Sequence, residues 1–280
     1  MKIEAVKTRL VHAGEISLEN LLEESLTNFA KKSGKEIHEI LPEKSIIVLS
    51  SKVAGLCENR VIKQSEIDRD ELIQRESEYY LDPSFSSYGH LFTINGNTLV
   101  SKAGIDVSNI GDDLYVLWPK DLFGLANRVR KFLREKYDIN DLGVIIIDSV
   151  SSPMRRGVKG EMLSWSGFEA VNNYVGEKDL FGREFQIEMS GVGVSLAIAA
   201  NIVMGEGAER SPIGIISDTD FVKFVSRDPT QEDIEQAFVP FDQDVFMPFL
   251  TMMPWKKGGN YDNRIVKQDI VPETQDSSFK

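Results

Sequence analysis

The stretch Val144-Ile145-Ile146-Ile147-Asp148-Ser149 is the most informative part of this sequence. Four β-prone residues in a row predict a strand that is buried on both faces of a sheet. The run ends abruptly in a carboxylate and a hydroxyl, which are oxygen ligands at the point where the chain leaves the sheet. Reactive centres in α/β architectures commonly lie at such strand ends. We therefore expect a site at Asp148 and Ser149.

Two adjacent arginines, Arg155 and Arg156, follow this strand between a proline and a glycine. Guanidinium groups form planar forks that bind phosphate or carboxylate. An anion clamp beside an oxygen-donor metal ligand is suited to a nucleotide. The alternative interpretation makes both arginines surface ion-pair donors.

We expect an α+β fold with mixed sheets and flanking helices. The clearest local signal is Leu91–Val100, where two alternating runs flank Asn95-Gly96, the preferred pair for a type I′ hairpin turn. The basic residues of an amphipathic helix over Leu122–Lys136 are interpreted as a solvated face. Strands are expected at residues 3–6, 45–50 and 213–216, and helices at 17–30, 66–80, 122–136 and 195–204, the last one ended by a glycine.

Composition limits the function classes. The chain has 280 residues, 41% of them hydrophobic and 27% charged, which is ordinary for a globular enzyme. Its net charge of −12 argues against nucleic-acid binding, which needs basic residues to neutralise phosphates. A single cysteine, Cys57, gives neither a disulfide framework nor a multi-cysteine zinc site. Because no signal peptide or bilayer-length apolar run is apparent, we expect a cytoplasmic protein without membrane contact.

The common nucleotide and hydrolase signatures are missing from the sequence: it has no Walker-type loop, GxGxxG, HExxH or GxSxG. The three histidines, His12, His38 and His90, are scattered and are expected to be surface or packing residues. A nucleotide site would therefore have to be built without these signatures.

Five segments, taken in order, resemble the motifs of the coenzyme F420-0:L-glutamate ligase family. They run from the Ala-Gly-Ile-Asp region to a glycine loop near the end of the match, at about Ile216. Together, with compatible spacing, they form a strong family-level signal. The segments are Ser101–Asn109, Asp148-Ser149, Arg155–Gly160, Gly176–Arg183 and Met204–Gly207 followed by Pro212.

The resemblance implies amide-bond formation between L-glutamate and a carboxylate acceptor, either F420-0 or a folate, at the expense of GTP and with Mg²⁺ or Mn²⁺. In the family's scheme the nucleotide phosphorylates the acceptor carboxylate, and the glutamate amine then attacks the acyl phosphate. A carboxylate is a poor electrophile until its oxygen becomes a leaving group. A metal neutralises charge on the transferred phosphoryl group.

Carried over by position, Asp106 and Asp148 would be metal ligands, with Ser149 adding a hydroxyl where relatives usually have threonine. Glu206 would bind a second metal. Arg155 and Arg156 would hold an anionic substrate group. The nucleotide contacts are expected at Ser51, Asn109, Gly205, Glu206 and Gly207.

Each assignment has a structural alternative. An aspartate just after a strand is often a helix cap or turn former, which applies to Asp106 and Asp148. The Gly205–Gly207 segment could be only a helix C-cap with a solvated glutamate. Asp179–Arg183 could be a structural turn rather than part of a site.

Four positions depart from the family pattern. Lys102 replaces an asparagine, Leu56 a nucleotide-contacting lysine, Val194-Ser195 two acidic residues, and Glu161-Met162 small apolar residues. These changes place the chain off the main F420 branch, and the run Phe238–Pro248 suits the folate side. They also keep open a non-catalytic relative that binds a nucleotide or metabolite.

The resemblance also implies a two-lobed subunit that pairs into a homodimer, with the nucleotide cleft near the lobe junction. We expect residues 1–268 to form the catalytic domain and residues 269–280 a disordered tail. No linker rich in proline, glycine or serine divides the chain. Any second lobe is therefore expected to come from non-contiguous segments, and its boundary is not readable from composition.

Overall fold

The computed structural model describes residues 1–111, 113–240 and 243–267. The expected tail at 269–280 lies outside the described residues. The chain divides into two compact units, and each unit is assembled from two separate segments. The first comprises Met1–Ile62 with Asp106–Asp233, and the second Lys63–Ile105 with Ile234–Lys280.

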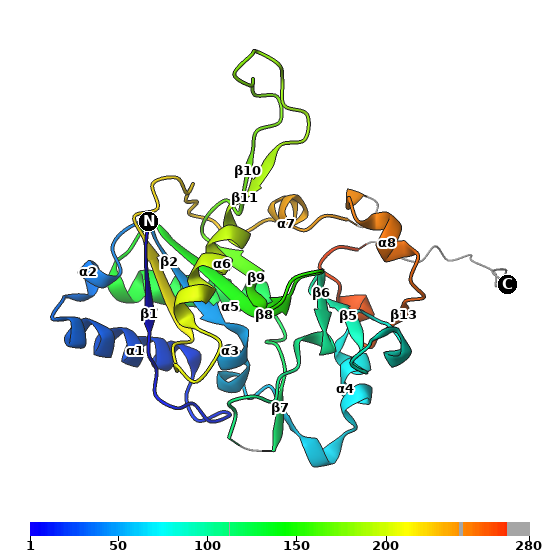
Figure 1. Cartoon of the computed structure of the whole chain (residues 1–280). Helices are drawn as coiled ribbons and strands as arrows, with labels where there is room; N and C mark the ends of the chain where they lie inside the picture. Colours follow the sequence, from blue (N-terminus) through cyan, green and yellow to red (C-terminus); the bar gives the residue numbers. More distant parts are fainter. Residues whose placement is uncertain (112, 241–242, 268–280) are drawn as a thin grey trace. The chain divides into compact units, whose positions relative to one another are not determined.

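The first unit is built on a five-stranded sheet with the order β1-β12-β2-β8-β9 (Figure 1). Strands β2 and β8 run parallel, whereas all other neighbours are antiparallel. This mixed sheet with its flanking helices confirms the α+β prediction. The strands are β1 (Lys2–Val6), β2 (Ser45–Ser50), β8 (Leu142–Ser151), β9 (Val158–Ser166) and β12 (Ile213–Ser217).

Helices cover both faces of this sheet. Helices α1 (Leu18–Ser33) and α5 (Leu122–Tyr137) pack their apolar faces on one side, in one continuous core with β2, β8 and β12. Helix α6 (Val192–Met204) covers the other side. It lies so close to β9 that a Cβ built on Gly160 would stand 2.7 Å from the carbonyl oxygen of Ala197. Only glycine therefore fits at this crossing.

Caps define the ends of the predicted helices. The hydroxyl of Ser17 accepts the backbone N–H of Asn20 at 3.2 Å, and Gly34 ends α1 in the left-handed conformation. Helix α6 starts three residues before the predicted range, and its end at Gly205 is as expected. The apolar face predicted for α5 is confirmed by the burial of Leu125, Val129 and Leu133.

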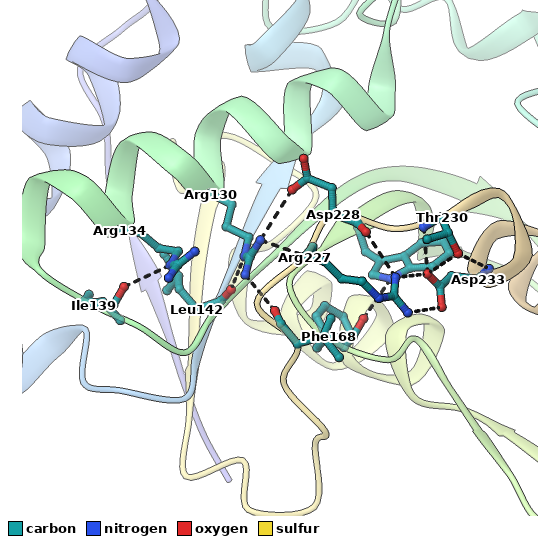
Figure 2. Close-up of polar contacts among 11 residues, drawn as sticks. Arg130, Arg134, Ile139, Leu142, Phe168, Arg227, Asp228, Thr230 and Asp233 are labelled. Carbon is teal, nitrogen blue, oxygen red and sulfur yellow. Dashed lines mark hydrogen bonds and ion pairs between the residues drawn. The ribbon is translucent and has the colours of Figure 1, made fainter.

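Arg130 corrects the interpretation of α5 as a helix with only solvated basic residues. Its side chain is buried and donates to the carbonyls of Leu142 at 3.0 Å and Val225 at 2.7 Å. Figure 2 shows that this arginine links the segment around Asp228 to the helix through a polar contact with the Asp228 carboxylate. Periodicity places Arg130 beside the apolar stripe, but it gives no sign of the carbonyls that a distant segment supplies.

Strand β8 is longer than the apolar run predicted. It continues through Asp148 and Ser149 to Ser151 because β9 pairs with it beyond the end of β2. Asp148 and Ser149 therefore do not mark the point where the chain leaves the sheet. They mark the point where the parallel neighbour ends, since Ser50 is the last residue of β2.

The second unit contains a four-stranded sheet in the order β13-β4-β5-β6, packed around Tyr79, Leu81, Ile94 and Trp255. The helix predicted at 66–80 is wrong in its extent, since α4 ends at Glu76 and the last residues form a buried strand. The elements are α4 (Arg69–Glu76), β4 (Tyr79–Tyr80), β5 (Phe92–Asn95), β6 (Thr98–Ser101), α8 (Met247–Thr251) and β13 (Lys256–Lys257).

The predicted hairpin at Leu91–Val100 is confirmed, but its turn is displaced by one residue. The two left-handed residues are Gly96 (φ 55°) and Asn97 (φ 53°), which is the type I′ pattern. Asn95 stays in the strand because its side-chain amide donates to Ala103 at 3.1 Å. The buried carboxylate of Glu78 accepts the N–H of Gly96 at 3.1 Å and stabilises this register.

Smaller elements complete the chain. No helix in the described part combines the length and apolar character needed to cross a lipid bilayer. The remaining helices and strands are α2 (Ile37–Ile40), α3 (Ser51–Cys57), β3 (Val61–Lys63), β7 (Leu114–Val116), β10 (Val171–Asn173), β11 (Met189–Gly191) and α7 (Gln231–Ala237).

Candidate active site

The predicted site residues on β8 point to opposite faces of the sheet. Successive side chains of a strand alternate between the two faces. Asp148 accepts the indole N–H of Trp118 at 2.7 Å, whereas the Ser149 hydroxyl donates to Oε1 of Glu206 at 2.9 Å. The side-chain amide of Asn201, on α6, donates to the same glutamate oxygen at 2.6 Å. Adjacent residues therefore serve two different clusters.

The surroundings of the Asp148 carboxyl group disfavour its negatively charged form. Burial raises its pKa from 3.8 to about 6, and the nearby charge of Asp106 adds to this effect. Hydrogen bonds from the Trp118 indole and from the Ser149 backbone oppose the rise. Asp106 therefore lies near enough to Asp148 for the two charges to repel each other. A cation between the two carboxylates would offset their repulsion.

Asp106 is held by its own turn and by one lysine. Its Oδ1 accepts the N–H groups of Val107 at 2.6 Å and Ser108 at 2.8 Å. Its Oδ2 lies 2.6 Å from Nζ of Lys52, in the first turn of α3. Burial opposes ionisation, but Lys52 and the Ser108 N–H outweigh it and hold the pKa of Asp106 below its usual value. Asp106 is therefore an anchored, charged side chain and also a turn former.

The loop after α6 contacts the loop after Asp106. The side-chain amide of Asn109 donates to the carbonyl of Gly207 at 3.1 Å. Gly205 adopts φ 85° and ends α6, so the helix-cap interpretation is correct for this residue. Glu206 is not merely solvated, because Ser149 and Asn201 hold its carboxylate. Four of the five predicted nucleotide contacts thus lie in two connected loops.

The four predicted metal ligands form two pairs. The charge of Asp106 acts on Asp148, and the Ser149 hydroxyl donates to Glu206. Within residues 1–111, 113–240 and 243–267, no three His, Cys, Asp or Glu side chains form a cluster that could hold one metal ion.

Arg155 and Arg156 are not brought to these pairs. Both lie in the exposed turn between β8 and β9, and the Arg155 guanidinium donates to the carbonyl of Met154. In the part of the chain that the structure describes, neither contacts a predicted metal ligand. Asp179 serves as a turn former, because its Oδ1 accepts the N–H groups of Phe181 and Arg183, each at 2.8 Å.

Sequence reasoning missed Lys52 and Trp118. Lys52 directly follows Ser51 at the end of a predicted strand, and this position was a usable signal. Trp118 gave no local signal, since its partner Asp148 is on another strand.

A family sequence profile described as F420-0:Gamma-glutamyl ligase matches residues 6–218. The chain belongs to the F420-0:gamma-glutamyl ligase family. This membership confirms the expected family and the expected enzyme class, a ligase that forms an amide bond.

Several archaeal proteins of the F420-0:gamma-glutamyl ligase family are similar to this chain. The coenzyme F420:L-glutamate ligase of Haloarcula marismortui is 34% identical over 180 residues, which cover 62% of this chain and 65% of the relative. The coenzyme F420:L-glutamate ligase of Archaeoglobus fulgidus is 29% identical over 209 residues, 66% of this chain and 82% of the relative. That of Methanosarcina mazei is 28% identical over 275 residues, 92% of this chain and 100% of the relative. The chain thus spans less than two thirds of the Haloarcula relative's length.

Two departures from the family pattern fall on helices α3 and α6. Leu56 is buried in an apolar cluster with Val11 and Val116. Val194 and Ser195 lie on α6 two turns before Asn201, and Ser195 is exposed. Neither departure removes a member of the two pairs.

Proposed function

We propose that this protein joins L-glutamate to the carboxylate of F420-0 through an amide bond, with GTP as co-substrate and Mg²⁺ or Mn²⁺. The observation that carries the proposal is the repulsion between the charges of Asp106 and Asp148, the two residues for which the family resemblance implies metal ligation. The names of the similar archaeal proteins support this choice of substrates. Family membership supports the ligase chemistry.

The donor groups fit a hard divalent cation. Carboxylate and hydroxyl oxygens are the ligands that Mg²⁺ and Mn²⁺ prefer. Asp106 and Asp148 would hold one cation, while Ser149 and Glu206 would hold a second. When bound, such cations neutralise charge on the transferred phosphoryl group.

The proposed reaction has two balanced steps. The acceptor carboxylate attacks the γ-phosphorus of GTP, which releases GDP and forms an acyl phosphate. The amine of L-glutamate then attacks the acyl carbon, loses a proton and expels inorganic phosphate as the amide forms. The contact between Asn109 and Gly207 orders the two loops expected around the nucleotide. Loops that are already ordered lose less conformational entropy when the substrate binds.

Asp148→Asn tests the proposal. The substitution keeps an oxygen that accepts from Trp118 but removes the ligating charge. We expect glutamate-dependent GDP release with F420-0 to fall by at least about 10²-fold. Asp138→Asn is the matched control, because Asp138 is an exposed residue in the left-handed conformation at the end of α5. Unchanged turnover in Asp148→Asn would remove the site assignment.

A folate is the second acceptor to test. The run Phe238–Pro248, which suggested the folate branch, includes two positions outside the described residues. Parallel assays with F420-0 and a reduced folate, followed by mass spectrometry of the product, distinguish the two acceptors. Glutamate added to the folate alone would replace the acceptor in this proposal and leave the chemistry unchanged. Binding of GTP without product from either acceptor would favour a non-catalytic relative.

We also propose that two copies of the chain pair through the β10–β11 arm. This arm is a two-stranded sheet whose tip, residues 174–188, projects away from its base (Figure 1). Leu180, Phe181 and Ile187 are 98%, 89% and 82% exposed. An isolated hairpin is only marginally stable, and large exposed apolar side chains commonly mark an interface. In a homodimer with twofold symmetry, the arm of each copy would contact the arm of the other, so both apolar tips would be covered.

Sedimentation equilibrium tests whether the β10–β11 arm mediates dimer formation. Phe181→Asp places a charge on the apolar tip and should convert dimers into monomers. Tyr88→Asp is the control, because Tyr88 is 85% exposed but belongs to the second unit. A wild-type protein that is monomeric at micromolar concentration would contradict the proposal.

A further inference from the structure

The ammonium group of Lys52 lies close to the carboxylate of Asp106, the predicted metal ligand. Its ammonium lies 2.6 Å from Oδ2 of Asp106 and donates to Ser108 at two points, the hydroxyl at 3.1 Å and the carbonyl at 3.3 Å. The lysine side chain is only 24% exposed. Three acceptors from one short turn therefore hold a single positive charge at this place.

The two oxygens of Asp106 have different partners. Oδ1 accepts two backbone N–H groups and the Ser108 hydroxyl, all from its own turn. Oδ2 receives the ammonium of Lys52 and a longer contact of 3.2 Å from the same hydroxyl. Because the backbone fixes Oδ1, a cation bound by Asp106 would use Oδ2. That is the oxygen to which Lys52 is bound.

Lys52 and a divalent cation at Oδ2 repel each other. At a separation of a few ångströms a single and a double positive charge oppose each other strongly when solvent is partly excluded. A lysine differs from a fixed ligand because four rotatable bonds let its ammonium move to a new partner. Ser51 precedes Lys52, and its hydroxyl lies beside Asp148. A displaced ammonium would therefore remain next to the expected nucleotide contacts.

We propose that Lys52 competes with the divalent cation for Asp106 and thereby couples cation binding to the binding of an anionic phosphate group. The cation displaces the ammonium from Oδ2, and the freed ammonium pairs with a phosphate oxygen of the co-substrate. Each ligand then strengthens the binding of the other by the same factor. This inference rests on the proposed function, since it needs a cation at Asp106 and Asp148.

Calorimetric titration with Mn²⁺, without nucleotide, tests the competition. Lys52→Met removes the competing charge and should bind Mn²⁺ about tenfold more tightly than the wild type. Lys52→Arg keeps a charge at this position and should bind more weakly than Lys52→Met. Lys131→Met is the control for the loss of one positive charge, because Lys131 is 76% exposed on α5. It should bind Mn²⁺ like the wild type.

A second titration tests the coupling. A non-hydrolysable GTP analogue should raise the Mn²⁺ affinity of the wild type by a larger factor than that of Lys52→Met. Lys52→Gln provides an independent neutral variant in case the methionine variant does not fold, which circular dichroism would show. These readouts do not depend on turnover.

The outcomes separate this inference from the proposed function. Mn²⁺ affinity in both neutral variants that equals or falls below the wild-type value overturns the role of Lys52. If the wild type also binds Mn²⁺ and Asp148→Asn does not, the cation site itself stands. If neither the wild type nor any Lys52 variant binds Mn²⁺, the cation site and the role of Lys52 both fail.

Discussion

Replacing Asp148 with asparagine should stabilise the metal-free protein at neutral pH. The Asp148 side chain is half-buried, and desolvation together with the charge of Asp106 raises its pKa from 3.8 to about 6. A carboxyl with a raised native pKa binds its proton more tightly in the folded chain than in the unfolded chain. Its contribution to stability is therefore complete below pH 4 and is lost as the pH rises to about 6.

The magnitude follows from the two pKa values. Each pH unit between 3.8 and about 6 corresponds to about 1.4 kcal/mol, so ionised Asp148 costs the fold about 2 to 3 kcal/mol. Asparagine carries no charge and still accepts from the Trp118 indole. With a chelator present, Asp148→Asn should therefore have the same free energy of unfolding as the wild type at pH 4. At pH 7.5 it should exceed the wild type by about 2 to 3 kcal/mol.

Urea unfolding at pH 4, 5.5 and 7.5 measures this difference directly. In the same experiment with Mn²⁺, the difference in stability should shift in favour of the wild type. A cation that binds only the folded wild type stabilises it by mass action, whereas the asparagine variant gains less. A difference between the two proteins that stays constant from pH 4 to 7.5 would refute the electrostatic reasoning. A metal-free wild type that is the more stable protein at pH 7.5 would do the same.

Three further predictions concern the surroundings of the site. Arg130→Met should lower the free energy of unfolding by about 2 to 4 kcal/mol in urea titrations, because two backbone carbonyls lose a buried donor. Arg128→Met, which breaks only an exposed ion pair, should change it by less than about 1 kcal/mol, and equal losses would contradict this account. Gly160→Ala should cost about 1 to 3 kcal/mol in the same assay, because its new Cβ would meet the α6 backbone at 2.7 Å, and an unchanged midpoint would contradict that contact. Trp118→Phe removes a hydrogen bond that lowers the folded-state pKa of Asp148, so the pH midpoint of the transition over which Asp148→Asn gains its stability advantage should move upward. A midpoint that stays in place or moves downward would show that the indole does not act on this carboxyl.

Local patterns sufficed wherever a segment's structure depends on its own residues. Strand β2 has the predicted bounds, because a short apolar run between polar residues fits only a buried strand here. Helix α1 begins after the predicted cap at Ser17. The hairpin forms where an Asn-Gly pair was found, although Glu78 and Ala103 shift its turn by one residue.

Contacts between distant segments could not be predicted in the same way. The apolar run of β8 gives no sign that β9 extends the strand past Asp148, and this extension separates Asp148 from Ser149. Nor does the basic face of α5 reveal that Arg130 turns inward to bind the carbonyl of Val225. In both cases the partner comes from another part of the chain.

The strand order of the first unit has a consequence during synthesis on the ribosome. Strand β12 lies between β1 and β2, although about two hundred residues are made between β1 and β12. Until residue 217 has emerged, β1 has no neighbour in the sheet and β2 presents an open edge. Bare strand edges attract other chains. Nascent chains shorter than this length therefore need protection from aggregation, and a fragment that ends before Ile213 will not fold into the first unit.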